Sequence, residues 1–220
     1  MTKPIIVRTL FFIFLFVCGN TLLSQQKPFK TSCVSWCFHG FGEGVDPEPV
    51  IETIGNLGFD GIQLMINTAN DLDNLWTAEK IKKVKVKLSE KQLELTSMVI
   101  FFPVIADLGS TDPKKVAESL VNFEKSCRIA ASLGTKRIEI ASPYITELAS
   151  WDKNGSVGVY KIADADYEVG EKISLRVAPD TDWTKIAVRM NKILSQCSEI
   201  AKKKGIGIGN GTPYQWVYFR

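Results

Sequence analysis

The polar side chains best suited to chemistry in this sequence stand in or just after short apolar stretches. Gln63 lies within GIQLMI, Glu139 lies within RIEIA, and His39, the only histidine of the chain, follows CVSWC. Histidine and glutamate can transfer protons, and glutamine offers a hydrogen-bond donor and an acceptor. Trp36, within CVSWC, offers a ring face on which a sugar can stack. These four residues are the substrate-binding candidates that the sequence provides.

Each candidate also has a purely structural interpretation. Gln63 and Glu139 can lie at a sheet edge or face solvent, His39 can be a loop residue, and Trp36 can pack in the core. Strand alternation puts Gln63 and Glu139 on faces opposite to their aliphatic neighbours. Polar residues in mid-strand favour a closed barrel, whose interior can line a pocket, over an open sheet covered on both faces.

Several common functional classes are excluded by motif. The single histidine excludes a multi-histidine metal site. The sequence also has no CxxC spacing of the kind that indicates a zinc site. A site of oxygen ligands for Mn²⁺ or Mg²⁺ needs carboxylates at several strand ends, of which Glu139 is one candidate. No GxSxG elbow or Walker loop occurs, and the glycines between residues 205 and 211 do not fit GxGxxG.

The elements that must position these residues alternate between strands and helices. Apolar stretches predict strands within residues 33–37, 61–66, 93–102, 137–141 and from 206 onward. Helices are predicted to begin near Asp46, Thr77, Asp112 and Asp182, which are suitable N-caps. A long polar segment, residues 142–180, follows the fourth strand and contains a hairpin signal at Asn154. Alternation of this kind implies a parallel sheet with its active groups at the carboxyl ends of the strands.

Apolar stripes on the predicted helices indicate which residues are buried. The first helix carries Val50, Ile51, Ile54 and Leu57 on one face, and the stripe of the last helix begins at Trp183. The densest charged cluster, the lysines of residues 80–87, is interpreted as a solvated helix face, because a net charge of +3 spread along the chain is no nucleic-acid footprint.

The cysteines are expected to be buried free thiols. Cys33 and Cys37 fall within a predicted strand, which separates them by about 13 Å, too far for a disulfide. Cys127 and Cys197 lie on the apolar stripes of two predicted helices.

The N-terminal segment has the layout of a secretory signal peptide. Lys3 and Arg8 precede the apolar stretch LFFIFLFV, and cleavage is predicted after Ser24. We therefore expect residues 25–220 to form one domain of a secreted or periplasmic protein with no stable membrane span, and a retained N-terminal anchor is the alternative.

Four stretches together resemble the xylose isomerase-like barrels of the sugar phosphate isomerase/epimerase superfamily: SCVSWCF, NLGFDGIQLM, SLGTKRIEIASP and AKKKGIGIGNGTPYQW. The resemblance implies an eight-stranded (β/α)₈ TIM barrel acting on a small-molecule carbohydrate. It further implies a divalent metal (Mn²⁺, Mg²⁺ or Zn²⁺) held by acidic and histidine ligands on strands five to eight. Proton transfer next to a sugar carbonyl or hydroxyl, with carboxylates as acid and base, is the implied chemistry.

The sequence departs from this family pattern in two strands and in the absence of strands six to eight. Gln63 stands where the family usually has glutamate, and Asn210 is the one residue at the family ligand position of the fifth strand. The three βα units that would complete the family barrel need roughly 100 further residues. We therefore expect a partial TIM barrel of about five βα units with a long loop after strand four. Such a fragment would be inactive, short of metal ligands and able to associate through open sheet edges.

Three alternatives stay open. A non-catalytic sugar-binding or interaction module would use Trp36, His39 and Trp151 near the loops. A DNA-repair endonuclease of the related zinc barrel type is disfavoured by the single histidine and the export signal. An open flavodoxin-like sheet is the alternative fold, since five strands suffice for it.

Overall fold

The computed structural model describes residues 30–40, 42–141, 150–151, 157–158, 182–212 and 215–217. The fold belongs to the unit Ser32–Arg220. The predicted signal peptide, residues 1–24, lies outside the described residues. Among the helices of the described ranges, none combines the length and the apolar character that a bilayer crossing requires.

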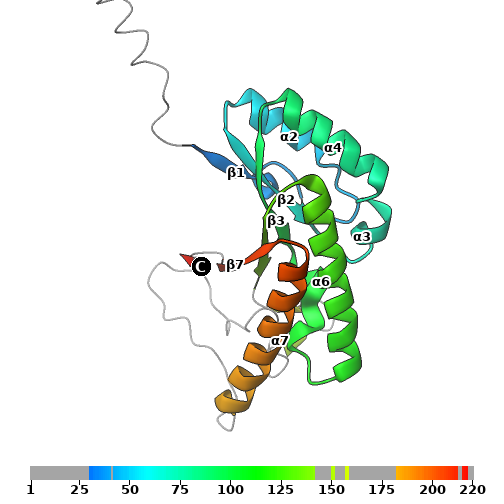
Figure 1. Ribbon diagram of the computed structural model, residues 1–220, viewed down its shortest axis with the longest axis vertical. Coiled ribbons are helices and arrows are strands. Elements are labelled where there is room, and N and C mark those ends of the chain that lie inside the picture. Colours follow the sequence, from blue (N-terminus) through cyan, green and yellow to red (C-terminus); the bar gives the residue numbers. More distant parts are fainter. Residues whose placement is uncertain are drawn as a thin grey trace, which may run out of the picture. The chain divides into compact units, whose positions relative to one another are not determined.

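A six-stranded sheet forms the body of this unit (Figure 1). The five strands β1, β2, β3, β4 and β7 pair in parallel and in chain order, and β8 runs antiparallel to β7. A flavodoxin-like sheet would have its first two strands exchanged, so the observed order contradicts that alternative and confirms a partial TIM barrel wall. The strand bounds are β1 Ser32–Val34, β2 Gly61–Ile66, β3 Glu94–Ile100, β4 Arg137–Ala141, β7 Gly207–Thr212 and β8 Gln215–Val217.

Long helices connect the successive strands and lie along one face of the sheet (Figure 1). The four shorter elements that follow strand ends were not predicted, because three or four residues carry no periodicity. The predicted hairpin is confirmed as β5 (Ser150–Trp151) paired antiparallel with β6 (Val157–Gly158). The helix bounds are α2 Glu48–Asn56, α3 Asp71–Asn74, α4 Ala78–Glu90, α5 Phe102–Ile105, α6 Pro113–Leu133 and α7 Trp183–Lys203, with 3₁₀ helices η1 Ser35–Cys37 and η2 Ala106–Gly109.

Side-chain caps fix where the long helices begin. The side chains of Thr77, Asp112 and Asp182 accept hydrogen bonds from backbone N–H groups at the starts of α4, α6 and α7. Each bond satisfies a donor that has no partner within the first turn of a helix. At its other end α6 stops at Gly134, whose φ of 95° suits a residue without a Cβ. The predicted helix bounds were accurate because these signals are local.

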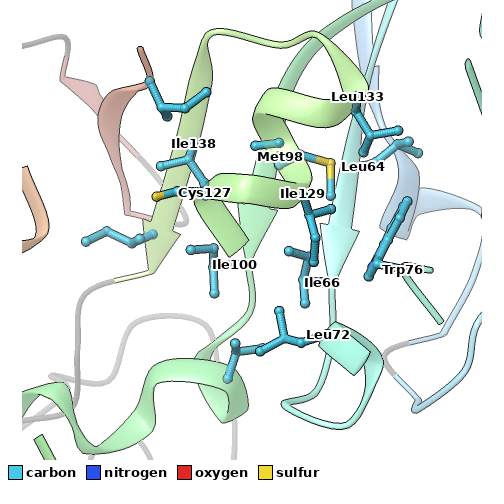
Figure 2. Close-up of a cluster of buried hydrophobic side chains, with 14 of the residues drawn as sticks. Leu64, Ile66, Leu72, Trp76, Met98, Ile100, Cys127, Ile129, Leu133 and Ile138 are labelled. Carbon is cyan, nitrogen blue, oxygen red and sulfur yellow. The ribbon is translucent and has the colours of Figure 1, made fainter. Parts of the chain in front are cut away.

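The aliphatic face of the sheet packs against the helices, as strand alternation predicts (Figure 2). Two helix positions were wrongly predicted as buried, since Leu57 is 59% and Trp183 is 54% exposed. Both stand at helix ends, beyond the turns that cover the sheet. The sheet residues of the core are Ile62, Leu64, Ile66, Met98, Ile100, Ile138 and Ile140.

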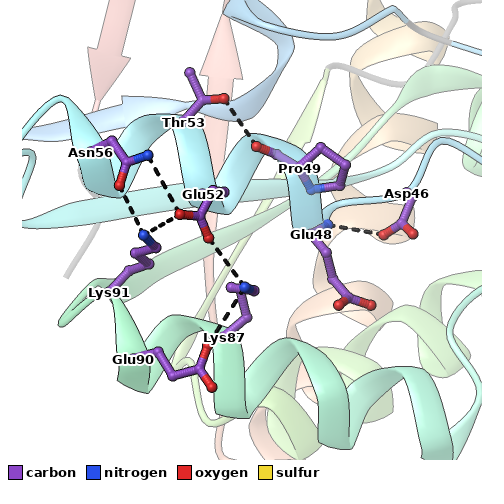
Figure 3. A network of polar contacts seen from close by, with 9 residues as sticks. All are labelled: Asp46, Glu48, Pro49, Glu52, Thr53, Asn56, Lys87, Glu90 and Lys91. Carbon is purple, nitrogen blue, oxygen red and sulfur yellow. Dashed lines mark hydrogen bonds and ion pairs between the residues drawn. The ribbon is translucent and has the colours of Figure 1, made fainter.

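Two lysines of the α4 cluster, Lys80 and Lys87, pair with acids of helix α2 or of the loop before it, and Figure 3 shows the pair of Lys87. Lys87 Nζ lies 3.1 Å from Glu52, which Lys91 also contacts. Lys80 Nζ lies 2.8 Å from Glu48 and 3.0 Å from Asp46. Charges that are paired within the fold offer little to an external polyanion, which agrees with the interpretation against nucleic-acid binding.

Candidate functional site

Gln63 and Glu139 meet on the sheet face that points away from the helices. The register places Gln63 of β2 beside Ser97 of β3, and Glu139 of β4 beside Val99 of β3. Residues paired in register share a face, and so do residues two apart along a strand. Gln63 Nε2 donates a hydrogen bond of 2.8 Å to Glu139 Oε1. The structure therefore brings together two of the sequence-predicted candidates, which lie 76 residues apart in the chain.

This hydrogen bond crosses over the intervening strand. β2 and β4 are neighbours of β3 but not of each other, so about 9.5 Å of sheet separates them. Glutamine and glutamate are long enough to span that gap together. Ser97, which lies between them on the same face, has one of the smallest side chains and leaves the crossing free.

The three polar side chains are almost completely buried, with Gln63 9%, Ser97 0% and Glu139 4% exposed. Gln63 Oε1 and Ser97 Oγ have no hydrogen-bond partner among the described residues. Buried polar atoms without a partner are rare and destabilising, so they mark places where a bound molecule can supply the missing bond. The cluster of Gln63, Ser97 and Glu139 is called the inner polar cluster below.

The environment of Glu139 favours its protonated form. Burial raises the pKa of this carboxyl above its ordinary value of 4.5, and the nearby Ser97 hydroxyl and the charge of Arg137 offset part of the rise. A raised pKa brings a carboxyl closer to the range in which it can both give and accept a proton at neutral pH.

Two further buried polar atoms lie at the carboxyl ends of the first strands. Ser35 opens η1 directly after β1, and Asn67 follows β2; Ser35 Oγ and Asn67 Oδ1 lack a partner among the described residues. Nearby, buried Asp71 accepts N–H bonds from Gly44 at 2.8 Å and Thr68 at 2.9 Å, which ties the loops after β1 and β2 together. Sequence reasoning missed Ser35 and Asn67, although a polar residue next to an apolar strand is a usable signal.

The predicted strand over residues 33–37 is wrong in its second half. β1 ends at Val34, and Phe38 N donates to Ser35 O at 3.0 Å to close a 3₁₀ turn. Trp36 lies in this turn and is partly exposed. His39 is also partly exposed, and its Nδ1 lies 2.6 Å from the carbonyl oxygen of Gly40. Neither residue is hydrogen-bonded to the inner polar cluster in the described part of the chain.

Strand β7 brings a glycine next to Glu139. Gly209 is the register partner of Glu139, whereas Asn210 pairs with Ile140 in the row of aliphatic residues. A Cβ atom on Gly209 would stand 3.2 Å from Glu139 Cγ, so the glycine leaves the room that the carboxylate side chain occupies. The side chains of Asn210 and Trp151 lie outside the described residues.

The side chains of the described residues do not make up the divalent-metal site that the resemblance implies. No group of three or more His, Cys, Asp or Glu side chains able to hold a metal occurs among the described residues. The inner polar cluster contributes one carboxylate, and hard cations such as Mg²⁺ and Mn²⁺ are usually held by several oxygen ligands. The described residues therefore do not support a reaction step that uses a metal.

The architecture is shared with known proteins. A family model described as xylose isomerase-like TIM barrel matches residues 51–209. No curated protein matches the chain.

Three solved structures illustrate the likeness. D-psicose 3-epimerase in the presence of D-fructose superposes with a TM-score of 0.56 at 17% identity, over 82% of this chain and 51% of that one. D-psicose 3-epimerase with D-tagatose from Clostridium cellulolyticum H10 gives 0.55 at 15% identity, over 82% and 51%. The apo form of 3-keto-D-glucoside 4-epimerase from E. coli gives 0.51 at 15% identity, over 82% and 54%. The chain thus spans about half the length of these structures, and identities this low show the fold alone.

Proposed function

Because the chain belongs to the xylose isomerase-like TIM barrel family, we propose that its described strands form the carbohydrate-binding wall of a sugar isomerase or epimerase. The observation that carries the proposal is the buried hydrogen bond from Gln63 to Glu139, beside which Gln63 Oε1 and Ser97 Oγ have no partner among the described residues. Sugar hydroxyls both donate and accept hydrogen bonds, so they match such a mixed set of groups.

Each member of the inner polar cluster has a distinct part in this proposal. Gln63 uses its amide N–H to hold the carboxyl of Glu139 and keeps its oxygen to accept from a sugar hydroxyl. Ser97 offers a hydroxyl that donates or accepts. Glu139 donates when protonated and accepts when ionised, and the burial that raises its pKa favours the protonated form. Ser35 and Asn67 extend the polar lining toward the carboxyl ends of the strands.

The substrate class follows from the family and its fold neighbours. D-fructose and D-tagatose accompany two of the neighbouring epimerase structures, so they are the first probes for this chain. Proton transfer at a sugar carbon needs an acid and a base. The inner polar cluster supplies one carboxylate, and Gly209 stands at the neighbouring position of β7. We therefore expect residues 1–220 alone to bind sugar without converting it, which is also the behaviour of a non-catalytic sugar-binding module.

The proposal extends to the location of the protein. The charged start, the apolar stretch LFFIFLFV and the ending at Ser24 support export and cleavage. N-terminal sequencing of protein recovered from the medium or periplasm should begin at Gln25. A mature chain that still begins at Met1 would contradict this part of the proposal.

Calorimetric titration of the purified chain with D-fructose, D-tagatose and a sugar phosphate tests the binding site. Gln63→Ala removes the hydrogen bonds of the amide and should weaken binding about tenfold, the effect of one or two hydrogen bonds. Glu139→Gln should weaken it similarly. Glu79→Gln is the matched control, because Glu79 is exposed and pairs with Lys83 one turn further along the same helix. Binding that is absent, or equal in all four proteins, would contradict the site.

Turnover is tested separately by incubating each sugar with the chain in D₂O and Mn²⁺ and following deuterium uptake at carbon by NMR. We expect no uptake. Metal-dependent exchange by the purified chain would contradict this expectation. It would show that further catalytic residues lie among those of the 220 that the structure does not describe.

A further inference from the structure

The turn after β1 brings together two cysteines that the sequence placed far apart. In an extended strand Cys33 and Cys37 would lie about 13 Å from one another. The strand instead ends at Val34, and η1 turns the backbone between the two residues. Because a turn shortens the distance across four residues, the two side chains can meet on one side of the chain.

The Cys37 thiol is a neighbour of the Cys33 thiol across this turn. Burial and, after it, the neighbouring Cys37 thiol raise the pKa of the Cys33 thiol. Cys33 Sγ also donates to the carbonyl oxygen of Val34, the last residue before the turn, at 3.7 Å. Cys33 is partly exposed and Cys37 is exposed, so the expectation of two buried thiols is wrong. Both cysteines are in the free form.

We propose that Cys33 and Cys37 form an oxidisable dithiol that closes to an intrachain disulfide at the carboxyl end of β1. The oxidant is a low-molecular-weight disulfide such as glutathione disulfide. Cys37 is the exposed member and attacks first: its thiolate displaces one glutathione thiol and forms a mixed disulfide. Cys33 then attacks the Cys37 sulfur and displaces the second glutathione. One glutathione disulfide becomes two glutathione thiols, and the protein loses two hydrogen atoms.

The other two described cysteines set the contrast. Cys127 of α6 and Cys197 of α7 are fully buried in the hydrophobic core, and burial raises the pKa of each to about 12. Neither a thiolate nor an approaching oxidant is favoured there. The redox chemistry of the described chain should therefore be confined to the turn after β1.

Closing this bond has a consequence for the surface around it. Trp36 lies between the two cysteines, so it would belong to the small ring that the disulfide closes. The bond would fix the turn that carries Trp36 and precedes His39. Oxidation would thus modify the carboxyl end of β1, in the sheet whose strands carry the inner polar cluster. It does not depend on sugar binding.

The test uses the full chain with Cys18→Ser, which leaves the four described cysteines. The reduced protein is equilibrated with mixtures of reduced and oxidised glutathione, quenched with acid, alkylated after unfolding and weighed by mass spectrometry. We expect oxidised protein to be lighter by two hydrogen atoms and to take up two fewer alkyl groups. No trypsin site lies between Cys33 and Cys37, so one peptide should carry the whole change.

Single substitutions identify the partners. Cys37→Ser and Cys33→Ser should each leave a cysteine that retains glutathione as a mixed disulfide, at a level about tenfold above the wild-type chain. Cys197→Ser is the matched control and should oxidise like the wild type. Circular dichroism checks that each variant folds, and Cys37→Ser, at an exposed position, is the less disruptive of the two. Two separate mixed disulfides, no reaction at all, or a Cys127–Cys197 bond would each overturn the proposal.

Discussion

At the scale of single residues, the main feature is a carboxyl, Glu139, that is buried without an ion pair to any of the described residues. Glu139 accepts a hydrogen bond from Gln63, and its pKa stays raised although the nearby Ser97 hydroxyl and the charge of Arg137 lower it. A stability-driven sequence would replace such a group with an apolar one, because burying a carboxylate opposes folding. Its presence on the face away from the helices therefore indicates a role toward a ligand.

The first prediction concerns the pH dependence of stability. The folded-state pKa of Glu139 is raised, so its contribution to stability is fully present below the unfolded value of 4.5 and is lost as the pH rises through the folded value. Urea unfolding of wild type and Glu139→Gln should thus show the variant gaining stability relative to wild type as the pH rises from 4 to neutrality. The gain is expected on this side because the pKa of Glu139 is raised on folding. A difference that stays constant with pH would mean that Glu139 titrates normally in the folded chain.

The second prediction uses two glycines of one strand. Gly209→Ala places a methyl group 3.2 Å from Glu139 Cγ and should destabilise the fold by about 1 kcal/mol while weakening sugar binding. Gly207→Ala is the control, since its Cβ would meet only the Lys136 carbonyl oxygen at an ordinary 3.6 Å. Chemical denaturation and calorimetry compare the two. Equal effects of both substitutions would show that proximity to Glu139 is not the cause.

At the scale of elements, local signals were sufficient for the long helices and insufficient for the turns. Thr77, Asp112 and Asp182 marked helix starts because a cap acts on backbone atoms two or three residues away. The end of β1 was missed because SWCF contains no glycine or proline to indicate a turn. The Gln63–Glu139 bond could not be predicted from sequence, since it depends on the register of three strands.

The third prediction tests the cap of α6. Asp112 Oδ1 accepts from Lys114 N at 2.9 Å, and Asp112→Ala removes that acceptor. The free energy of unfolding should fall by about 1 kcal/mol, the usual cost of losing an N-cap. Asp112→Asn keeps an oxygen in place and should cost much less. If both variants lose the same stability in urea titrations, charge rather than the cap is responsible.

At the scale of the whole molecule, the family resemblance correctly indicated the barrel wall, and alternation of strands with helices correctly indicated its parallel sheet. The identity of the sugar could not be predicted from the sequence, because specificity depends on which groups converge in space rather than on their spacing along the chain. Ser35 and Asn67 could have been flagged as polar residues next to strands, but that their oxygens and that of Ser97 lack partners among the described residues is known only from the structure.

The fourth prediction follows from the outermost strands. In the described part of the chain β1 and β8 each pair with one neighbour, so their outer sides present backbone donors and acceptors to another chain. We propose that the chain self-associates through these edges. Sedimentation velocity over a hundredfold range of protein concentration should show a rising mean mass. A single monomer peak at every concentration would rule it out.

The chain-order pairing of the sheet has a consequence for how the protein acquires its structure. Within the six-stranded sheet, each of the strands β2, β3, β4 and β7 pairs with the parallel strand that comes before it in the sequence. A nascent chain can therefore add one strand and its covering helix at a time, without waiting for a distant segment to be synthesised. The hydrogen bond from Gln63 to Glu139 can form only after β4 has paired with β3, so its formation marks the addition of the fourth strand to the sheet.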